Sequence, residues 1–301
     1  MSDRAATVIA TFSRRMHIAF PGGSEAFARI KGKTITPVCG DVVTVDSLPG
    51  EADWLITGIE KRRNALSRPS RRGTPEVLAA NVDVLVAVAA ASPVPDWFIV
   101  DRYLCAAEIM HSDAILVFNK VDEPKPPGTE AALSVYADIG YPIHCASAET
   151  GEQVDALRRS IGTRTAILVG QSGVGKSSLI NLLSAPSQQR TAGISRKTGE
   201  GRHTTVNSMM LPLPGGGTVI DSPGVRDYAP ALADITDAET GFREIAAAAT
   251  ACRFANCRHL KEPDCAVKSA VDNGTIDARR YESYRRVFRL VERLQGRTSG
   301  K

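Results

Sequence analysis

The segment Gly170–Ser177 constrains the fold of this chain more than any other feature. It reads GQSGVGKS and matches the pattern GxxxxGK(S/T) at every fixed position. The apolar run Thr165–Val169 precedes it and the helical pattern Ser177–Leu183 follows it, which gives the strand–loop–helix context that a phosphate-binding loop requires. Glycines let backbone N–H groups turn toward phosphate oxygens, and the helix N-terminus adds positive potential. We therefore predict a loop that binds nucleotide phosphates.

Two side chains of this loop have predicted chemical roles. Lys176 should reach the β- and γ-phosphates and take part in catalysis, and the Ser177 hydroxyl should ligate Mg²⁺. The other nucleotide contacts predicted here are Gly170, Gln171, Ser172, Gly173, Val174, Gly175 and Ser178. The alternative, a chance glycine-rich turn, is disfavoured because the strand and the helix are both in place.

A tetrad that follows the predicted strand Ala114–Phe118 indicates which base is bound. It consists of Asn119, Lys120, Val121 and Asp122 and matches the NKxD tetrad of GTPases. The carboxylate of Asp122 can accept hydrogen bonds from guanine N1–H and the 2-amino group. Adenine lacks this donor pair, so a buried Asp122 would be left unpaired with ATP. Asn119 should hold the neighbouring loops, and Lys120 should pack its stem along the base. Alone, the tetrad could be a solvated turn, but together with the phosphate loop it predicts GTP.

Two further segments extend the predicted site. Ser147-Ala148-Glu149 follows the predicted strand Pro142–Cys145 and resembles the SA(K/E) motif, whose backbone contacts the base. Asp221-Ser222-Pro223-Gly224 follows the predicted strand Thr218–Ile220 and resembles the DxxG motif. In that motif the aspartate, Asp221, holds Mg²⁺ through water, and the N–H of Gly224 senses the γ-phosphate.

Residues 185–208 show no periodicity, which predicts a functional loop. Within it, Gly201–Thr205 (GRHTT) supplies switch threonines, and we expect Thr205 to complete the Mg²⁺ shell and serve catalysis. The residue after the DxxG glycine is Val225, where Ras-like GTPases carry a water-orienting glutamine. Valine cannot orient water, so the intrinsic rate should be low unless His203 substitutes as a catalytic group. His203 could equally be a surface contact.

The order of the motifs is informative. Ordinary small GTPases present the phosphate loop first, then the switch threonine, DxxG, NKxD and SAK. Here the tetrad and Ser147–Glu149 precede the phosphate loop, so we predict a circularly permuted domain. Permutation is physically permissible because the termini of a compact domain usually lie close together. As a consequence, the DxxG segment leads directly into the C-terminal block, and nucleotide state could be transmitted to that block.

The regions around these motifs indicate the architecture. Strands and helices alternate from about residue 75 to 230, with Val82–Ala90 as a continuous apolar strand, which predicts an open parallel sheet with helices on both faces. The helices predicted between the strands cover residues 96–112, 129–139 and 152–161. Before this region, short apolar runs separated by turn signals predict a small β-barrel or sandwich. These runs are Thr7–Phe12, Met16–Phe20, Val42–Val45 and Trp54–Ile59.

A cluster near the C-terminus combines three cysteines and one histidine: Cys252, Cys257, His259 and Cys265. Four such ligands within fourteen residues match a closed, tetrahedral, structural Zn²⁺ site with no position free for water. The spacing differs from that of a C2H2 finger, so it does not imply DNA reading. The alternatives are a disulfide, which is disfavoured in a cytoplasmic protein, or unliganded core cysteines.

Composition adds only broad limits. The formal net charge of +4 permits an anionic partner without demanding one. No apolar run is long enough for a signal peptide or a membrane span, so we expect a cytoplasmic protein without a membrane partner.

These motifs, in this order, resemble the ribosome small-subunit-dependent GTPase A (RsgA) family over essentially the whole chain. The segments that carry the resemblance are Asn119–Asp122, Ser147–Glu149, Gly170–Asn181, Gly201–Thr205, Asp221–Arg226, Cys252–Cys265 and the basic linker pattern Arg63-x-x-Leu66-x-Arg68-Pro69. One departure is Val206, where the family often has a third threonine, and this blurs which threonine binds Mg²⁺.

The resemblance implies three domains: an OB-fold RNA-binding domain at 1–72, a permuted P-loop GTPase domain of α/β class at 73–232, and a small α-helical zinc-binding domain at 233–301. It also implies GTP hydrolysis stimulated by the small ribosomal subunit, during late maturation of that subunit. The partners would be the subunit, its rRNA and GTP or GDP, and we expect the protein to be a monomer.

Charge agrees with RNA as a partner. Residues 1–72 contain twelve Lys and Arg against seven Asp and Glu. In the last predicted helix, residues 276–294, one set of side chains recurs at helical spacing and should face the domain: Tyr281, Tyr284, Phe288, Val291 and Leu294. A second set includes the outward positions: Arg279, Arg280, Arg285, Arg286, Arg289 and Arg293. As a set these arginines are candidate phosphate contacts, and the alternative is a solvated surface.

Two other functions stay open on the sequence alone. One is a nucleotide-regulated RNA-binding module whose hydrolysis is incidental, which the absence of stimulation by small subunits would favour. The other is a GTPase of the large subunit or of membranes, which co-sedimentation with separated subunits would test.

Overall fold

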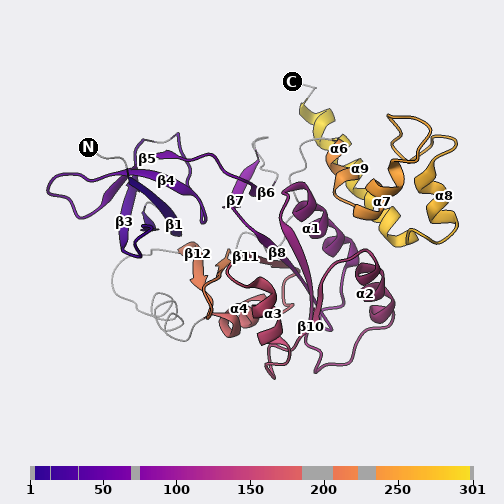
Figure 1. Ribbon diagram of the computed structural model, residues 1–301, viewed down its shortest axis with the longest axis horizontal. Helices are drawn as coiled ribbons and strands as arrows, with labels where there is room; N and C mark the ends of the chain where they lie inside the picture. Colours follow the sequence, from indigo (N-terminus) through magenta and orange to yellow (C-terminus); the bar gives the residue numbers. More distant parts are fainter. Residues whose placement is uncertain are drawn as a thin grey trace.

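The structure is a computed structural model that describes residues 4–13, 15–32, 34–68, 75–184, 206–222 and 235–298. Figure 1 shows a strand-rich N-terminal part, a central sheet flanked by helices and a helical C-terminal part, arranged in chain order. The α/β class and the succession of barrel, GTPase-like sheet and helical block agree with the sequence prediction.

The N-terminal part is a five-stranded barrel of β1 (Arg4–Phe12), β2 (Met16–Ala19), β3 (Glu25–Ile30), β4 (Val42–Asp46) and β5 (Trp54–Ile59). The strands pair in the order β1-β2-β3-β5-β4, and β4 pairs back onto β1, which closes the barrel. A closed five-stranded barrel is the architecture of the OB-fold. The sequence prediction missed β3, because only Ala28 of this strand is buried and the apolar pattern is weak.

The basic linker that contains the pattern Arg63-x-x-Leu66-x-Arg68-Pro69 is partly a strand. β6 (Ala65–Arg68) pairs antiparallel with β7 (Glu76–Ala80) in a separate two-stranded sheet. Leu66 is fully buried in the central core, and the guanidinium of Arg62 forms two hydrogen bonds with the buried carboxylate of Asp41. Pattern analysis missed β6 because Leu66 is its only fully buried residue, so the strand shows little apolar periodicity.

The central sheet follows the predicted alternation. Its parallel strands are β8 (Val84–Ala90), β9 (Asp113–Asn119), β10 (Ile143–Cys145), β11 (Thr165–Gly170) and β13 (Thr218–Asp221), in the order β10-β9-β8-β11-β13. One hydrophobic cluster packs α1 (Trp97–Ile109) and α2 (Thr129–Asp138) on the sheet, and a second packs α3 (Val154–Ile161) and α4 (Lys176–Leu183). Helices therefore cover both faces, as predicted.

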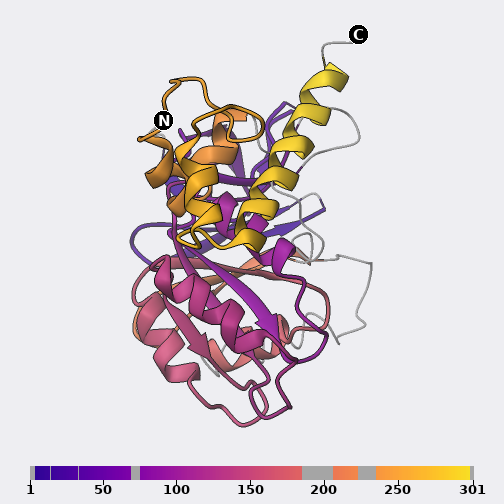
Figure 2. The same cartoon turned by 90° about the vertical axis from the view of Figure 1, so that its right-hand side faces the viewer.

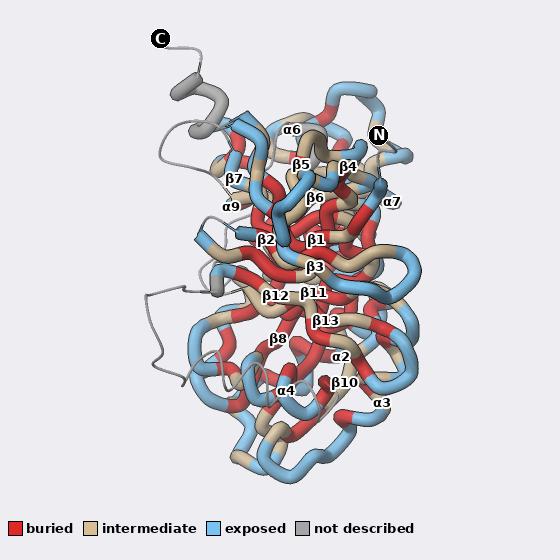
Figure 3. The backbone as a smooth tube through the Cα atoms, turned by 90° about the vertical axis from the view of Figure 1, so that its left-hand side faces the viewer, coloured by how far each residue is buried: buried red, intermediate tan, exposed pale blue. Residues whose placement is uncertain are grey.

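One strand joins the barrel to the central sheet. β12 (Val206–Pro212) pairs antiparallel with β13 on one edge and with β1 of the barrel on the other. Residues 206–208, predicted as the end of a loop, are therefore the start of a strand, since β1 supplies the second partner. Figure 3 shows buried residues in the barrel strands and in the central sheet, with residues of intermediate burial along β12 between them.

The C-terminal part contains α6 (Ile235–Thr240), α7 (Arg243–Ala249), α8 (Ala266–Asp272) and α9 (Ala278–Thr298). Figure 2 shows these helices gathered at one end of the molecule, beside the helices of the central part. Tyr284, Phe288 and Val291 are buried in a separate hydrophobic cluster, and Tyr281 packs against it, as the helical spacing predicted. The side chain of Leu294 lies outside the described residues.

Two arginines predicted as outward phosphate contacts point inward instead. Arg280 is fully buried; it forms an ion pair of 2.8 Å with the buried Asp101 of α1 and one of 2.7 Å with Glu244 of α7. Arg279 donates to Asp101 at 2.9 Å and to the hydroxyl of Tyr136 at 3.1 Å. Burial alone would lower the pKa of Arg280, but the two carboxylates raise the pKa well above its ordinary value, so the guanidinium stays charged. This network fixes α9 on the GTPase-like part.

The rest of the arginine set differs in exposure. Arg286 and Arg289 are exposed on α9, and Arg285 is partly buried, so these three stay available as surface contacts. The side chain of Arg293 lies outside the described residues.

Replacing Arg280 with Met should lower the free energy of unfolding by about 3–5 kcal/mol, because the buried Asp101 would keep only Arg279 and the partly buried Glu244 would lose its cation. Urea unfolding followed by circular dichroism measures this change. Arg289→Met on the exposed face of the same helix is the matched control and should change the free energy by less than about 0.5 kcal/mol. Equal effects of the two substitutions would show that the buried network does not stabilise the docking of α9.

Candidate nucleotide site and metal centre

The predicted nucleotide motifs meet at one edge of the central sheet. β9 ends at Asn119, β10 ends two residues before Ser147, β11 ends at Gly170 and β13 ends at Asp221. These strands are parallel, so their carboxyl ends lie at the same edge. The chain runs outward from β8 to β10 and then returns to β11 on the other side of β8. This reversal is the switch point at which open α/β sheets bind their ligands.

The loop between β11 and α4 has the backbone that phosphate binding needs. Gly173 and Gly175 have φ angles of 83° and 90°, in the left-handed region that favours glycine. A Cβ atom at Gly175 would also collide with the side-chain amide of Asn119. The loop and the first turn of α4 line a cavity of about 230 Å³, formed by Ser172, Gly173, Gly175, Lys176, Ser177 and Ser178. The ammonium of Lys176 donates to the carbonyls of Gly170 and Gln171, both at 2.6 Å, and lies along this loop.

Asn119 ties three segments of the site together. Its side chain is fully buried; Nδ2 donates to the carbonyl of Val174 in the phosphate loop at 2.8 Å, and Oδ1 accepts from the backbone of Ala148 at 3.0 Å. Both ends of the amide are therefore used, and the tetrad, the Ser147–Glu149 segment and the phosphate loop are held in one geometry.

Ser147 orients the carboxylate of Asp122. Its Oγ donates to Asp122 Oδ1 and accepts from the backbone N–H groups of Glu149 at 3.2 Å and Thr150 at 3.1 Å. The hydroxyl proton is thereby committed to Asp122. Asp122 itself is exposed, not buried as the argument from the sequence assumed.

The other predicted site residues either belong to the described part of the chain or lie outside it. Lys120 has a positive φ of 62° and is partly buried beside the tetrad. Asp221 closes β13, and the hydroxyl of the next residue, Ser222, lies 3.0 Å from that of Ser208 on β12. The remaining expectations concern His203, Thr205, Gly224 and Val225, which lie outside the described residues.

The phosphate loop also has a partner that the sequence did not indicate. Oε1 of Gln171 accepts a hydrogen bond of 3.0 Å from the backbone of Asp96, the N-cap residue of α1. Because α1 also carries Asp101, one helix connects the phosphate loop to the ion network under α9.

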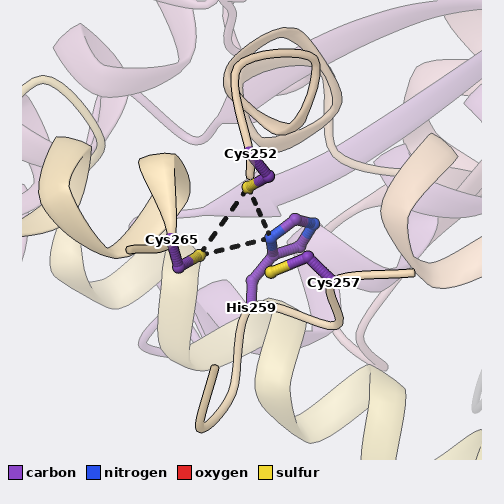
Figure 4. A group of neighbouring side chains, drawn as sticks. All are labelled: Cys252, Cys257, His259 and Cys265. Atoms are coloured by element: carbon purple, nitrogen blue, oxygen red, sulfur yellow. Dashed lines mark hydrogen bonds between the residues drawn. The ribbon is translucent and has the colours of Figure 1, made fainter. Parts of the chain in front are cut away.

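The cysteines and the histidine predicted as metal ligands converge, as Figure 4 shows. The four ligand atoms of Cys252, Cys257, His259 and Cys265 lie within 4.8 Å of one another. The Nδ1 atom of His259 is 3.5 Å from Cys252 Sγ and 3.4 Å from Cys265 Sγ, and these two sulfurs are 3.9 Å apart. Ligands around a tetrahedral ion with bonds of about 2.0–2.3 Å would be about 3.5–3.8 Å apart. The cluster can therefore hold a metal ion.

A carboxylate outside the cluster orients its histidine. Glu239 Oε2 lies 3.1 Å from His259 Nε2, so the ring can donate from Nε2 and direct the lone pair of Nδ1 toward the thiols. The ligand loop is also held by α9, since the hydroxyl of Tyr281 donates to the carbonyl of His259 at 2.5 Å. Sequence analysis did not identify Glu239, because it precedes the first cysteine by thirteen residues and lies in no spacing pattern.

A parallel sheet whose strand ends carry a phosphate loop and a guanine tetrad, with the tetrad first, defines a circularly permuted GTPase. Residues 59–230 match the family model described as RsgA GTPase. The chain belongs to this family.

Within the described residues, no helix combines the length and apolarity needed to cross a membrane.

Relatives resemble the chain along most of its length. The Small ribosomal subunit biogenesis GTPase RsgA of Pseudomonas aeruginosa is 37% identical over 289 residues, which cover 95% of this chain and 85% of the relative. The protein of the same name from Actinobacillus pleuropneumoniae is 40% identical over 237 residues, covering 78% and 69%.

Two solved structures share the whole fold. YjeQ from Thermotoga maritima superposes with a TM-score of 0.75 and 27% identity, covering 96% of this chain and 99% of that one. YloQ, described as a circularly permuted GTPase, gives a TM-score of 0.73 with 25% identity and covers 97% and 96%.

Proposed function

We propose that this GTPase acts in late maturation of the small ribosomal subunit. It binds the subunit and its rRNA in the GTP state and leaves after hydrolysis that the subunit stimulates. The observation that carries this proposal is the match to relatives named for small-subunit biogenesis along 95% of the chain. Residues 1–72 contain twelve Lys and Arg against seven Asp and Glu, and the excess lies in the basic linker that follows the barrel, which agrees with an RNA partner.

The nucleotide roles follow from the geometry at the sheet edge. Asp122, oriented by Ser147, accepts from guanine N1–H and the 2-amino group, and Lys120 packs along the base. The loop Gly170–Ser178 surrounds the phosphates with backbone N–H groups, and the ammonium of Lys176 moves from its two carbonyl partners to the β- and γ-phosphates.

Oxygen donors at the same edge fit Mg²⁺. The Ser177 hydroxyl lines the phosphate cavity, Asp221 closes the neighbouring part of the sheet, and the predicted switch residue Thr205 would supply another hydroxyl. When bound, Mg²⁺ neutralises charge on the phosphate oxygens. Gly224 would sense the γ-phosphate, and His203 would orient the attacking water in place of the glutamine that Val225 replaces.

The C-terminal cluster is proposed to hold one structural Zn²⁺. Three thiolates and one imidazole are soft or borderline donors, and the Glu239–His259 pair resembles the outer hydrogen bond common at zinc sites.

The proposed domains are 1–72, 73–232 and 233–301. The protein is proposed to act as a cytoplasmic monomer, in the compartment where ribosomal subunits mature.

The rate of GTP hydrolysis with and without isolated small subunits tests this function. We expect a low basal rate, stimulation by small subunits and little effect of large subunits at the same concentration. Absence of stimulation would favour the alternative, a nucleotide-regulated RNA-binding module with incidental hydrolysis. Stimulation by large subunits alone would overturn the proposal as well.

A further inference from the structure

An aromatic side chain stands on the outside of the barrel without contributing to its core. Phe27 on β3 is 37% exposed, whereas its neighbour Ala28 is fully buried and faces the barrel interior. In the β2–β3 register Phe27 lies opposite His17. The two rings stack, with centroids 4.9 Å apart and planes inclined by 21°. The guanidinium carbon of Arg15 lies 4.1 Å from the centre of the Phe27 ring. We call Arg15, His17 and Phe27 the stacking platform.

Acidic neighbours hold the platform in place and neutralise it. Nε of Arg15 donates to the carboxylate of Asp53 at 2.9 Å, and Nε2 of His17 lies 3.1 Å from Glu25. The guanidinium of Arg15 and the imidazole of His17 therefore each already have a carboxylate partner, which leaves little net charge to attract a phosphate. What the platform offers a ligand is the outer plane of the Arg15 guanidinium, which lies over the Phe27 ring, and the exposed part of the two stacked rings.

The stacking platform lies close to the start of β12, the strand that joins the barrel to the central sheet. Phe12, whose ring centre is 6.2 Å from that of Phe27, is the β1 residue that pairs with Val206 at the start of β12. In the sequence, Val206 directly follows the predicted switch threonine Thr205. A ligand on the platform would thus lie beside the strand that leads out of the predicted switch segment.

We infer that the stacking platform binds one unpaired nucleobase of RNA. The inference rests on the proposed function, which supplies RNA as the partner. In OB-folds the face formed by strands 2 and 3 binds oligonucleotides, and the platform lies on β2 and β3. Aromatic rings and guanidinium planes stack on bases that are splayed out of a helix, whereas paired bases hide their faces from protein side chains.

Two substitutions at Phe27 test the platform through its π surface. Phe27→Leu keeps the apolar volume and removes the ring, while Phe27→Tyr keeps the ring. The probes are a single-stranded 12-mer oligouridylate and the isolated small subunit, with affinity measured by fluorescence anisotropy and by sedimentation. Phe27→Leu should weaken both affinities about 5- to 100-fold, and Phe27→Tyr should restore them to within about twofold of the wild type. The slope of log affinity against log salt should not change, because no phosphate contact is lost.

A matched control separates this site from aromatic surface in general. Phe254 in the C-terminal part is 40% exposed and also has an arginine, Arg253, over its ring at 5.4 Å. Phe254→Leu should leave oligouridylate binding unchanged, and thermal melting should show that all variants fold. The platform inference is overturned if the wild type does not bind oligouridylate, if Phe27→Leu binds it as the wild type does, or if Phe254→Leu loses equal affinity.

The two proposals fail separately. If the wild type binds oligouridylate through Phe27 but small subunits do not stimulate its GTP hydrolysis, the proposed function is contradicted. The inference that the platform binds a nucleobase is then still supported. Stimulation of the wild type together with unchanged binding by Phe27→Leu contradicts the platform alone.

Discussion

Replacing Asp122 with Asn should change the base preference of the enzyme from guanine to xanthine. The reason lies in Ser147, whose hydroxyl accepts from two backbone N–H groups and so must donate to residue 122. In the variant, the amide oxygen would take this proton and the amide nitrogen would face the base. That nitrogen is a donor opposed to the 2-amino donor of guanine, but it matches the 2-carbonyl oxygen of xanthine.

GTP affinity should fall about 10²- to 10³-fold in Asp122→Asn, while XTP affinity rises by a similar factor. Equilibrium titration with fluorescent GTP and XTP measures both affinities. Glu123→Gln removes the same charge at the next residue and should leave the preference for GTP intact. A variant that loses GTP affinity without gaining XTP would mean that Asp122 supports the loop and does not read the base.

The nucleotide edge was predictable because each motif is local. Gly170 and Asn119 each lie at the end of an apolar strand, and parallel strands bring their carboxyl ends together whatever their order along the chain. Pattern analysis therefore located the loop, the tetrad and the permutation. It could not show that Asn119 bonds to both the phosphate loop and Ala148, since these contacts cross 55 and 29 residues.

The misses share a physical cause, which is that burial came from distant partners. β12 is a strand because β1 pairs with its second edge. Arg280 is buried because its guanidinium forms ion pairs with Asp101 and Glu244. An arginine is normally exposed, so its residue type predicted the wrong side, although Arg280 lies four residues before Tyr284 on the buried stripe of the helix. Ion pairing across the two parts overrides this preference.

Removing the metal from the C-terminal cluster should unfold the C-terminal helices and leave GTP binding largely intact. α7 and α8 have seven residues each, too few for a stable helix without tertiary support. Cys257 and Cys265 are themselves buried members of the hydrophobic cluster that these helices share with α9. Structural zinc contributes about 10–16 kcal/mol of apparent binding free energy in small zinc domains, which exceeds what so small a core can supply.

The test compares the metal-bound protein, the chelated protein and Cys252→Ser by hydrogen exchange and by titration with fluorescent GTP. Protection should be lost in residues 243–292, while protection of β8, β9 and β11 and the affinity for GTP should persist, because the nucleotide edge uses no residue of this block.

Cys145→Ser, a cysteine outside the cluster, should keep one zinc per chain by elemental analysis. Glu239→Gln should bind zinc about 10- to 100-fold more weakly without unfolding in excess zinc. Purified protein without stoichiometric zinc, or a chelated protein with full protection in the C-terminal helices, would contradict a structural metal. Loss of GTP affinity on chelation would instead mean that the ion network between Asp101 and Arg280 transmits the state of the metal centre to the phosphate loop through α1.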